Sequence, residues 1–259
     1  VGKVAQDLHV EGCKQLEQIV RDEALDARAV YGFFKAGGEG EDLVIPASEE
    51  TLDREYRIQC LRQQKKFGRS EHFYSLVDFI APRDSNHQDY IGAFVVSAGH
   101  GLDDIVQHYE DKHDDFSAIM AKVLADRLAE AFAEYLHRQA RRDCGFGLDE
   151  GLSPQDLIGE GYRGIRPAPG YPACPDHCLK FALFDLLGAQ KAIDVRLTEH
   201  ASMWPAAAVS GFYFNHPQAR YFNVGPITLE QVMDYAERRQ IGLEEAQRWL
   251  EPNLAYEPK

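Results

Sequence analysis

Residues 166–177 read Arg166-Pro-Ala-Pro-Gly-Tyr-Pro-Ala-Cys-Pro-Asp-His177, and the rest of the chain is organised around this stretch, called here the proline loop. Each of its four prolines fixes φ near about −65° and pushes the preceding residue towards extended geometry, which excludes a helix or a central strand. We therefore expect a stiff, ordered loop that carries a few polar side chains: Arg166, Tyr171, Asp176 and His177. Such a loop suits a small-molecule site, although its composition is equally compatible with a surface connection.

The totals describe an ordinary globular chain of 259 residues with 44% hydrophobic and 27% charged residues. No internal repeat or linker divides it, so we expect one domain over residues 1–259.

The formal net charge of −14 argues against a nucleic-acid partner. No apolar run of about 18 residues is present, so we expect no membrane span. Five cysteines, an odd number, favour reduced thiols and a cytoplasmic location. The start at Val1, without methionine or signal peptide, indicates a fragment or a processed start.

Hydrophobic periodicity and turn residues predict runs of strands alternating with runs of helices. Predicted strands cover residues 29–34, 43–45, 56–61, 74–80, 90–97, 195–197, 206–214 and 220–224. Predicted helices cover residues 2–24, 103–142, 153–158, 175–188, 228–240 and 243–250. This order is not a regular βαβ alternation. It predicts an α+β fold with a largely antiparallel twisted sheet flanked by helices, including one long helix.

The long helix carries two stripes, one apolar and one acidic. A break is expected near His113, after which the apolar residues keep a period close to 3.6 and predict the buried face: Phe116, Ile119, Met120, Val123, Leu124, Leu128, Phe132, Tyr135 and Leu136. Asp126, Glu130 and Glu134 follow one another at a spacing of four, so their carboxylates stack on one face and repel. This acidic stripe is either a solvated face or a place where Glu130 meets a cationic ligand.

Three short motifs resemble known functional motifs but lack the sequence context that those motifs require. Residues 159–164 match GxGxxG, but a dinucleotide loop needs a strand before it and a helix after it, and neither is expected here. Cys174, His177 and Cys178 have no distant second pair of ligands, which makes a poor zinc pattern. Ser210 lacks the first glycine of a nucleophile elbow.

Beyond these patterns, residues 164–172 closely resemble the C-terminal activation domain of cobalamin-dependent methionine synthase. The resemblance extends over nearly all of the chain, through residues 89–94, 125–132, 197–199, 209–214 and 249–254. It implies that the domain binds S-adenosylmethionine and takes part in reactivating the parent enzyme after its cobalamin has been oxidised. In that family, cobalamin oxidised to cob(II)alamin is reduced by an electron from flavodoxin or a related flavoprotein and is trapped as methylcobalamin by the methyl group of S-adenosylmethionine. Cobalamin itself is bound by a neighbouring domain of the same enzyme, and the fragment alone is not expected to be active.

The resemblance also implies a set of ligand-binding residues: Arg166, Ala168, Tyr171, Tyr221, Phe222 and Glu130. Arg166 suits the ligand's carboxylate, and the backbone around Ala168 and Tyr171 suits the adenosyl end. The aromatic faces of Tyr221 and Phe222 suit a sulfonium cation. The resemblance gives no catalytic residue and no metal ligand.

The sequence departs from the family pattern in two places, and two alternatives to the reactivation function stay open. The family uses a further aspartate upstream of the first helix, before Val1, and Phe222 stands where some members carry tyrosine. A stand-alone S-adenosylmethionine sensor or docking module is the alternative function, and an inert structural domain is a third reading. A docking face for the electron donor is expected at one of two basic clusters: Arg62, Lys65, Lys66 and Arg69, or Arg138, Arg141 and Arg142.

Overall fold

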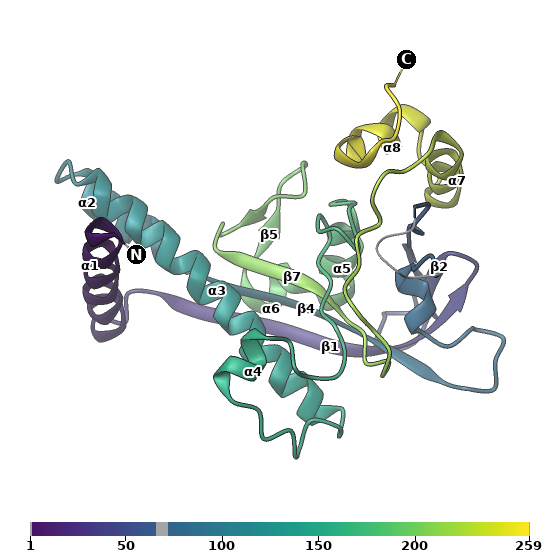
Figure 1. The fold of residues 1–259 in the computed structure, drawn as a ribbon, viewed down its shortest axis with the longest axis horizontal. Helices are drawn as coiled ribbons and strands as arrows, with labels where there is room; N and C mark the ends of the chain where they lie inside the picture. Colours follow the sequence, from purple (N-terminus) through teal and green to yellow (C-terminus); the bar gives the residue numbers. More distant parts are fainter. Residues whose placement is uncertain (1, 66–71, 259) are drawn as a thin grey trace. The chain divides into compact units, whose positions relative to one another are not determined.

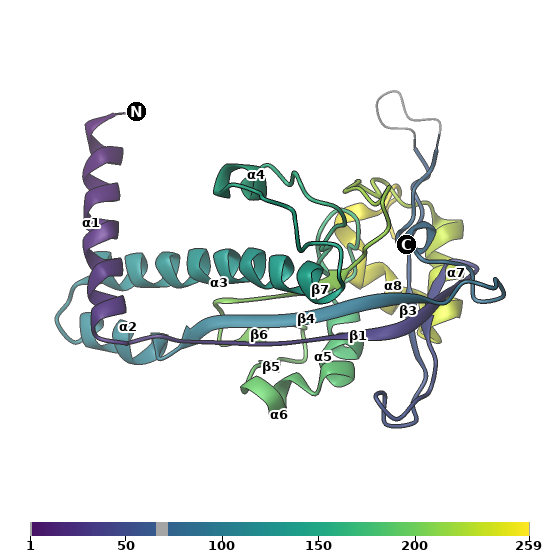
Figure 2. The same cartoon turned by 90° about the horizontal axis from the view of Figure 1, so that it is seen from below.

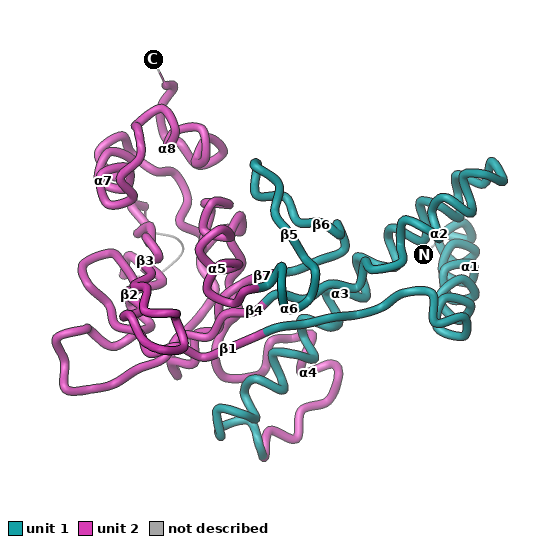
Figure 3. The backbone as a smooth tube through the Cα atoms, turned by 180° about the vertical axis from the view of Figure 1, so that it is seen from behind, with its two compact units in different colours: residues 1–30, 95–148, 189–209 teal, residues 31–94, 149–188, 210–259 magenta. Residues whose placement is uncertain are grey.

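The computed structural model describes residues 2–65 and 72–258, and Figure 1 shows their arrangement. Lys66 and Arg69 of the first basic cluster lie outside the described residues. By compactness the chain separates into two units, coloured in Figure 3. Unit 1 comprises residues 1–30, 95–148 and 189–209, and unit 2 comprises residues 31–94, 149–188 and 210–259. The expectation of one domain stays a prediction, because compactness does not show which parts fold alone.

The predicted fold class, α+β with an antiparallel sheet, is confirmed. A five-stranded sheet has the order β3-β2-β1-β4-β7, and a separate two-stranded sheet joins β5 to β6. The strands are β1 (Asp26–Glu39), β2 (Asp42–Ile45), β3 (Tyr56–Gln59), β4 (Asp89–His100), β5 (Arg196–Leu197), β6 (Met203–Trp204) and β7 (Ala208–Tyr213). β2 pairs antiparallel with both β1 and β3, with Leu43 opposite Gly38 and Ile58.

Unit 1 is built on the long helix α3 (Asp115–Asp143), which packs against α2 (Leu102–Glu110) and α1 (Lys3–Arg21). The short helix α6 (Ala189–Ile193) also belongs to this unit. The predicted break falls between α2 and α3, where Asp114 caps α3 by accepting from the Ser117 backbone N–H at 3.0 Å. α1 crosses α3 (Figure 2), with Gly12 near the Met120 sulfur and Gln15 Nε2 donating to the Ser117 carbonyl at 2.9 Å. Among the described residues, no helix is long and apolar enough to cross a membrane.

The expected buried face of α3 is wrong at several positions. Phe116, Ile119, Val123 and Tyr135 are exposed, while the helix buries a row made mostly of alanines: Ala118, Ala121, Ala125, Ala129, Ala133 and Ala140. Alanine loses no side-chain entropy on burial, and its small side chain lets neighbouring backbones pack closely. A row of alanines can therefore form the buried face of a helix, whereas the prediction followed the larger apolar residues, which are exposed here.

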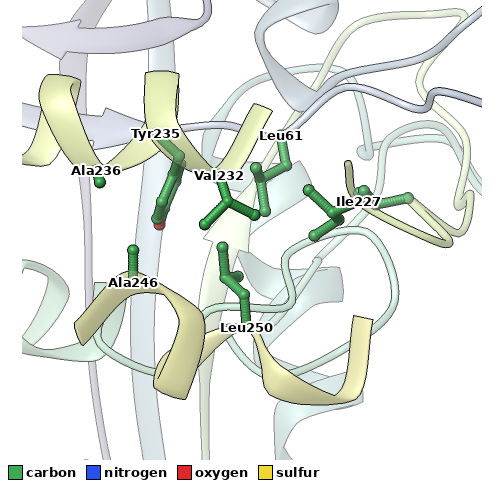
Figure 4. Packing of buried hydrophobic residues seen from close by; sticks show 8 residues of the cluster. Leu61, Ile227, Val232, Tyr235, Ala236, Ala246 and Leu250 are labelled. Atoms are coloured by element: carbon green, nitrogen blue, oxygen red, sulfur yellow. The ribbon is translucent and has the colours of Figure 1, made fainter. Parts of the chain in front are cut away.

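Unit 2 contains α4 (Pro154–Ile158), α5 (Leu179–Leu187), α7 (Leu229–Arg239), α8 (Leu243–Trp249) and the 3₁₀ turns η1 (Leu76–Phe79) and η2 (Glu251–Asn253). A hydrophobic core joins α7 and α8 to the chain after β3 (Figure 4), and its buried members are Leu61, Val224, Ile227, Val232, Tyr235, Ala236, Ala246 and Leu250.

Two predicted strands of unit 2 are wrong. Residues 74–80 contain η1 because Ser75 and Asp78 form a capping box, in which the Ser75 backbone N–H donates to Asp78 at 2.9 Å. Residues 220–224 have no regular structure. Their backbone is tied to the proline loop instead, since the Val224 N–H donates to the Pro172 carbonyl at 2.8 Å.

Candidate functional site

The proline loop begins beside the end of β7. Ile165 and Phe214 exchange two backbone hydrogen bonds of 3.0 Å, and the Phe212 N–H donates to the Pro167 carbonyl at 3.0 Å. Proline has no N–H, but its carbonyl oxygen still accepts a hydrogen bond. Pro167 can therefore pair with the Phe212 N–H although it has no donor of its own. The loop is therefore ordered, as its prolines predicted, and its first residues extend the edge of the sheet beside β7.

A tight turn at residues 168–174 follows. The Tyr171 N–H donates to the Ala168 carbonyl at 3.1 Å, the Cys174 N–H to the Tyr171 carbonyl at 2.8 Å, and the Gly170 N–H to the Cys174 carbonyl at 2.7 Å. Gly170 has φ +98°, and a Cβ there would lie 2.0 Å from the His177 ring. Only glycine fits this position, because both the backbone conformation and the imidazole exclude a side chain.

Replacing Gly170 with alanine is expected to lower the melting temperature and weaken binding at the loop, because the new methyl group displaces the His177 ring or opens the turn. Gly242→Ala is the control, since φ is −67° there and nothing lies within 4 Å of the added carbon. Differential scanning calorimetry of both variants measures the effect. Equal melting temperatures would show that the turn rearranges without cost.

Arg166 is held at both its backbone and its side chain. Its backbone N–H donates to the Tyr221 hydroxyl at 3.0 Å. Its Nη1 donates to the Tyr162 hydroxyl, and its guanidinium carbon lies 5.9 Å from the centre of the Tyr162 ring. The structure thus brings together Arg166 and Tyr221, two residues predicted to share a site, and adds Tyr162.

Ala168 and Tyr171 present polar groups at the turn. In the part of the chain that the structure describes, the Ala168 backbone N–H donates to no protein acceptor. Tyr171 is 57% exposed, and its hydroxyl has no hydrogen-bond partner among the described residues. A partly buried N–H without an acceptor is costly unless water or a ligand accepts from it. This edge of the loop is suited to an external polar group.

Phe222 and Glu130 occupy different settings. Phe222 is half-buried, with its ring centre 6.0 Å from that of Tyr74 and 6.3 Å from that of Phe79. Glu130 is exposed on α3 in unit 1, whereas the other predicted residues belong to unit 2. Lys122, also on α3, lies 3.7 Å from Glu110 of α2. The ligand-binding roles of all six residues stay predictions.

Asp176 anchors the far end of the proline loop, a role that the sequence did not reveal. Its side chain is 1% exposed and accepts from the Cys178 backbone N–H at 2.7 Å, the Tyr235 hydroxyl at 2.7 Å and Nη1 of Arg239. Tyr235 and Arg239 belong to α7, about 60 residues further on. No local spacing signals this contact, because α7 reaches the loop only through the tertiary fold.

Three of the five cysteines are buried in unit 2. Burial raises the pKa of the Cys60 and Cys174 thiols well above the usual range, and it raises the pKa of Cys178 to about 12. Cys13 and Cys144 are exposed. Since the thiolate is the reactive form, the two groups of cysteines must differ in reactivity.

Ellman's reagent is expected to label Cys13 and Cys144 quickly in the folded protein, and Cys60, Cys174 and Cys178 only after denaturation. Peptide mapping by mass spectrometry identifies the labelled positions. Rapid native labelling of Cys60 or Cys174 would contradict the packing of unit 2 around them.

The structure makes both basic clusters less suitable as docking faces than the sequence suggested. Arg141 is 1% exposed, so it cannot contribute to a surface, although Arg138 and Arg142 are exposed. Arg62 is half-buried and donates to Glu41 at 2.5 Å and to both oxygens of Asp78 at 2.7 Å. Its charge is compensated within the fold, so it adds little to any external positive field.

This geometry defines a class of protein: an α+β domain with a proline-stiffened loop that presents polar groups at the edge of its sheet. A family model described as the activation domain of vitamin B12-dependent methionine synthase matches residues 1–240. The chain belongs to this family. It is also similar to a solved structure, the crystal structure of the MetH reactivation domain bound to AdoHcy. The two share 44% sequence identity with a TM-score of 0.92, over 99% of this chain and 79% of that chain.

Proposed function

We propose that this chain binds S-adenosylmethionine at the proline loop of unit 2 and presents its methyl group for the reductive methylation of cob(II)alamin in a cobalamin-dependent methionine synthase. The proposal depends above all on the conformation of residues 166–171, which hold a guanidinium, an N–H with no acceptor among the described residues and an exposed tyrosine on one ordered turn. Membership of the family and the similarity to a domain bound to AdoHcy support it.

The ligand offers a carboxylate, an ammonium group, a sulfonium and an adenosine, and the predicted residues complement them. Arg166 pairs with the carboxylate through charge-assisted hydrogen bonds. The Ala168 N–H and the backbone near Tyr171 pair with the adenosyl end. The rings of Tyr221 and Phe222 favour the sulfonium, and Glu130 favours the positive charges of the ligand. AdoHcy lacks the methyl group and the sulfonium charge but keeps the groups that Arg166 and Ala168 recognise.

When bound, S-adenosylmethionine supplies an electrophilic methyl group on sulfur, and cobalamin on a neighbouring domain, reduced by an electron from flavodoxin or a similar flavoprotein, accepts it. The residues of this chain bind and orient the donor. No side chain here needs to move a proton, so the contribution of the chain is proximity and orientation. We accordingly assign no catalytic residue, and we expect no methyl transfer by the chain alone.

The proposed partners are the cobalamin-binding domain of the same enzyme and the flavoprotein electron donor. We propose a cytoplasmic location because all five cysteines are free thiols and the parent reaction uses reduced cofactors.

Isothermal titration of the chain with S-adenosylmethionine and with AdoHcy tests the binding proposal directly. We expect saturable one-to-one binding of both ligands, and a rise in melting temperature that follows ligand concentration. Absence of binding to both ligands would overturn the proposal and favour a structural domain.

Methyl transfer needs a separate test. The chain, joined to or mixed with the cobalamin-binding domain, a flavodoxin and its reductase, is expected to convert cob(II)alamin to methylcobalamin in the presence of S-adenosylmethionine. The absorbance spectrum of the corrin follows this conversion. Tight ligand binding without conversion would favour the alternative, a sensor or docking module.

A further inference from the structure

Tyr162 lies in residues 159–164, the segment with the GxGxxG pattern that is not a dinucleotide loop, and the proposed function gives it no role. Gly164 has φ +91°, and a Cβ there would lie 2.7 Å from the Phe214 carbonyl oxygen. Only glycine allows the chain to pass so close to the end of β7. This close approach sets the path of the chain between Tyr162 and Arg166.

Tyr162 holds the guanidinium of Arg166 through its hydroxyl, which accepts a hydrogen bond from Nη1. The guanidinium carbon lies 5.9 Å from the ring centre, a distance that follows from this contact at the hydroxyl end of the ring. A free arginine side chain loses rotamer entropy when a ligand fixes it. A guanidinium that is already oriented by its neighbours loses less of that free energy on binding.

A second tyrosine fixes the other half of the same residue. The Tyr221 hydroxyl accepts from the Arg166 backbone N–H at 3.0 Å. One hydroxyl therefore holds the main chain and the other holds the side chain. An arginine side chain carries five N–H donors, more than one hydroxyl can accept from.

We propose that Tyr162 is a positioning residue, which orients Arg166 towards the ligand's carboxylate and makes the site selective for ligands that carry one. The inference depends on the proposed function, because it assigns a specificity determinant to the same site. It concerns Arg166 only, and leaves recognition of the adenosyl end to Ala168 and Tyr171.

The test compares two ligands in two backgrounds. S-Adenosylmethionine has the carboxylate, whereas its decarboxylated form keeps the adenosine, the sulfonium and the amine but lacks it. Calorimetry of Tyr162→Phe should show about 3- to 10-fold weaker binding of S-adenosylmethionine, as expected for the loss of one hydrogen bond of ordinary strength that orients Arg166. Binding of the decarboxylated ligand should be unchanged.

In an Arg166→Ala background, Tyr162→Phe should add no further loss for S-adenosylmethionine, because the group that it orients is absent. Tyr256→Phe is the matched control: its hydroxyl accepts from Gln247 at 3.1 Å, and it makes the same chemical change elsewhere in unit 2. Melting temperatures of all variants establish that they fold.

Several results would overturn the inference. Equal losses for both ligands would assign Tyr162 a general structural role, and a loss that persists without Arg166 would separate the two residues. Tighter binding in Tyr162→Phe would make Tyr162 a competitor for Arg166. Failure of the unaltered chain to bind S-adenosylmethionine is a distinct outcome, which rejects the proposed function itself.

Discussion

Replacing Arg166 with alanine is expected to weaken S-adenosylmethionine binding by about 2 kcal/mol or more, which is roughly a 30-fold rise in the dissociation constant. The reason is the loss of a charge-assisted pair with the ligand's carboxylate. The guanidinium is already tethered to Tyr162, so little of its interaction with the ligand is lost to ordering. Isothermal titration measures the change.

Arg28→Ala is the matched control for Arg166→Ala, because Arg28 pairs only with exposed Asp26 at 2.7 Å in unit 1 among the described residues. Its replacement should leave binding unchanged. Arg166→Ala with unaltered affinity would reject Arg166 as the carboxylate ligand. A comparable loss for decarboxylated S-adenosylmethionine would show that the arginine acts through the shape of the loop instead of the carboxylate.

Asp176→Asn is expected to have the largest effect on stability, about 3 kcal/mol. The amide keeps the shape of the carboxylate but removes the charge, which leaves the guanidinium of Arg239 buried beside a neutral partner. Asp176 is 1% exposed, so solvent screens this interaction very little. For a chain of this length, the melting temperature should fall by about 6–12 °C, measured by calorimetry.

Asp26→Asn provides the contrast, because its ion pair with Arg28 is exposed and should contribute less than about 0.5 kcal/mol. Asp176 also ties the proline loop to α7, so Asp176→Asn should weaken S-adenosylmethionine binding together with stability. If the melting temperature fell while the affinity stayed the same, the loop would hold its conformation without this anchor.

The stiffness of the loop at the candidate site could be predicted from local sequence, but the contacts that hold the loop in place could not. Four prolines in twelve residues indicate a rigid loop wherever the loop lies, since their effect on φ is local. The partners of that loop are remote: Tyr221 lies 55 residues after Arg166, and Tyr235 lies 59 residues after Asp176. A hydrogen bond over such a separation leaves no periodic signal in the sequence.

The two wrongly predicted strands have different origins, one in a remote contact and the other in a local capping box. Residues 220–224 have the composition of a strand, but their backbone is tied to Pro172. Strand propensity reports a fit to a pleated surface, and no strand in the described part of the chain pairs with this segment. Residues 74–80 also resemble a strand in composition, yet the capping box of Ser75 and Asp78 turns them into η1.

By itself the sequence determined the α+β class, the long helix α3, the stiffness of the proline loop and the resemblance that led to the family. These depend on periodicity, on backbone restrictions and on a specific string of residues, all of which are local. Only the tertiary structure decided that α3 buries alanines, that Arg141 is inaccessible, and that Tyr162 and Tyr221 hold Arg166. Burial and long-range hydrogen bonds depend on which segments meet, and that depends on the packing of the chain as a whole.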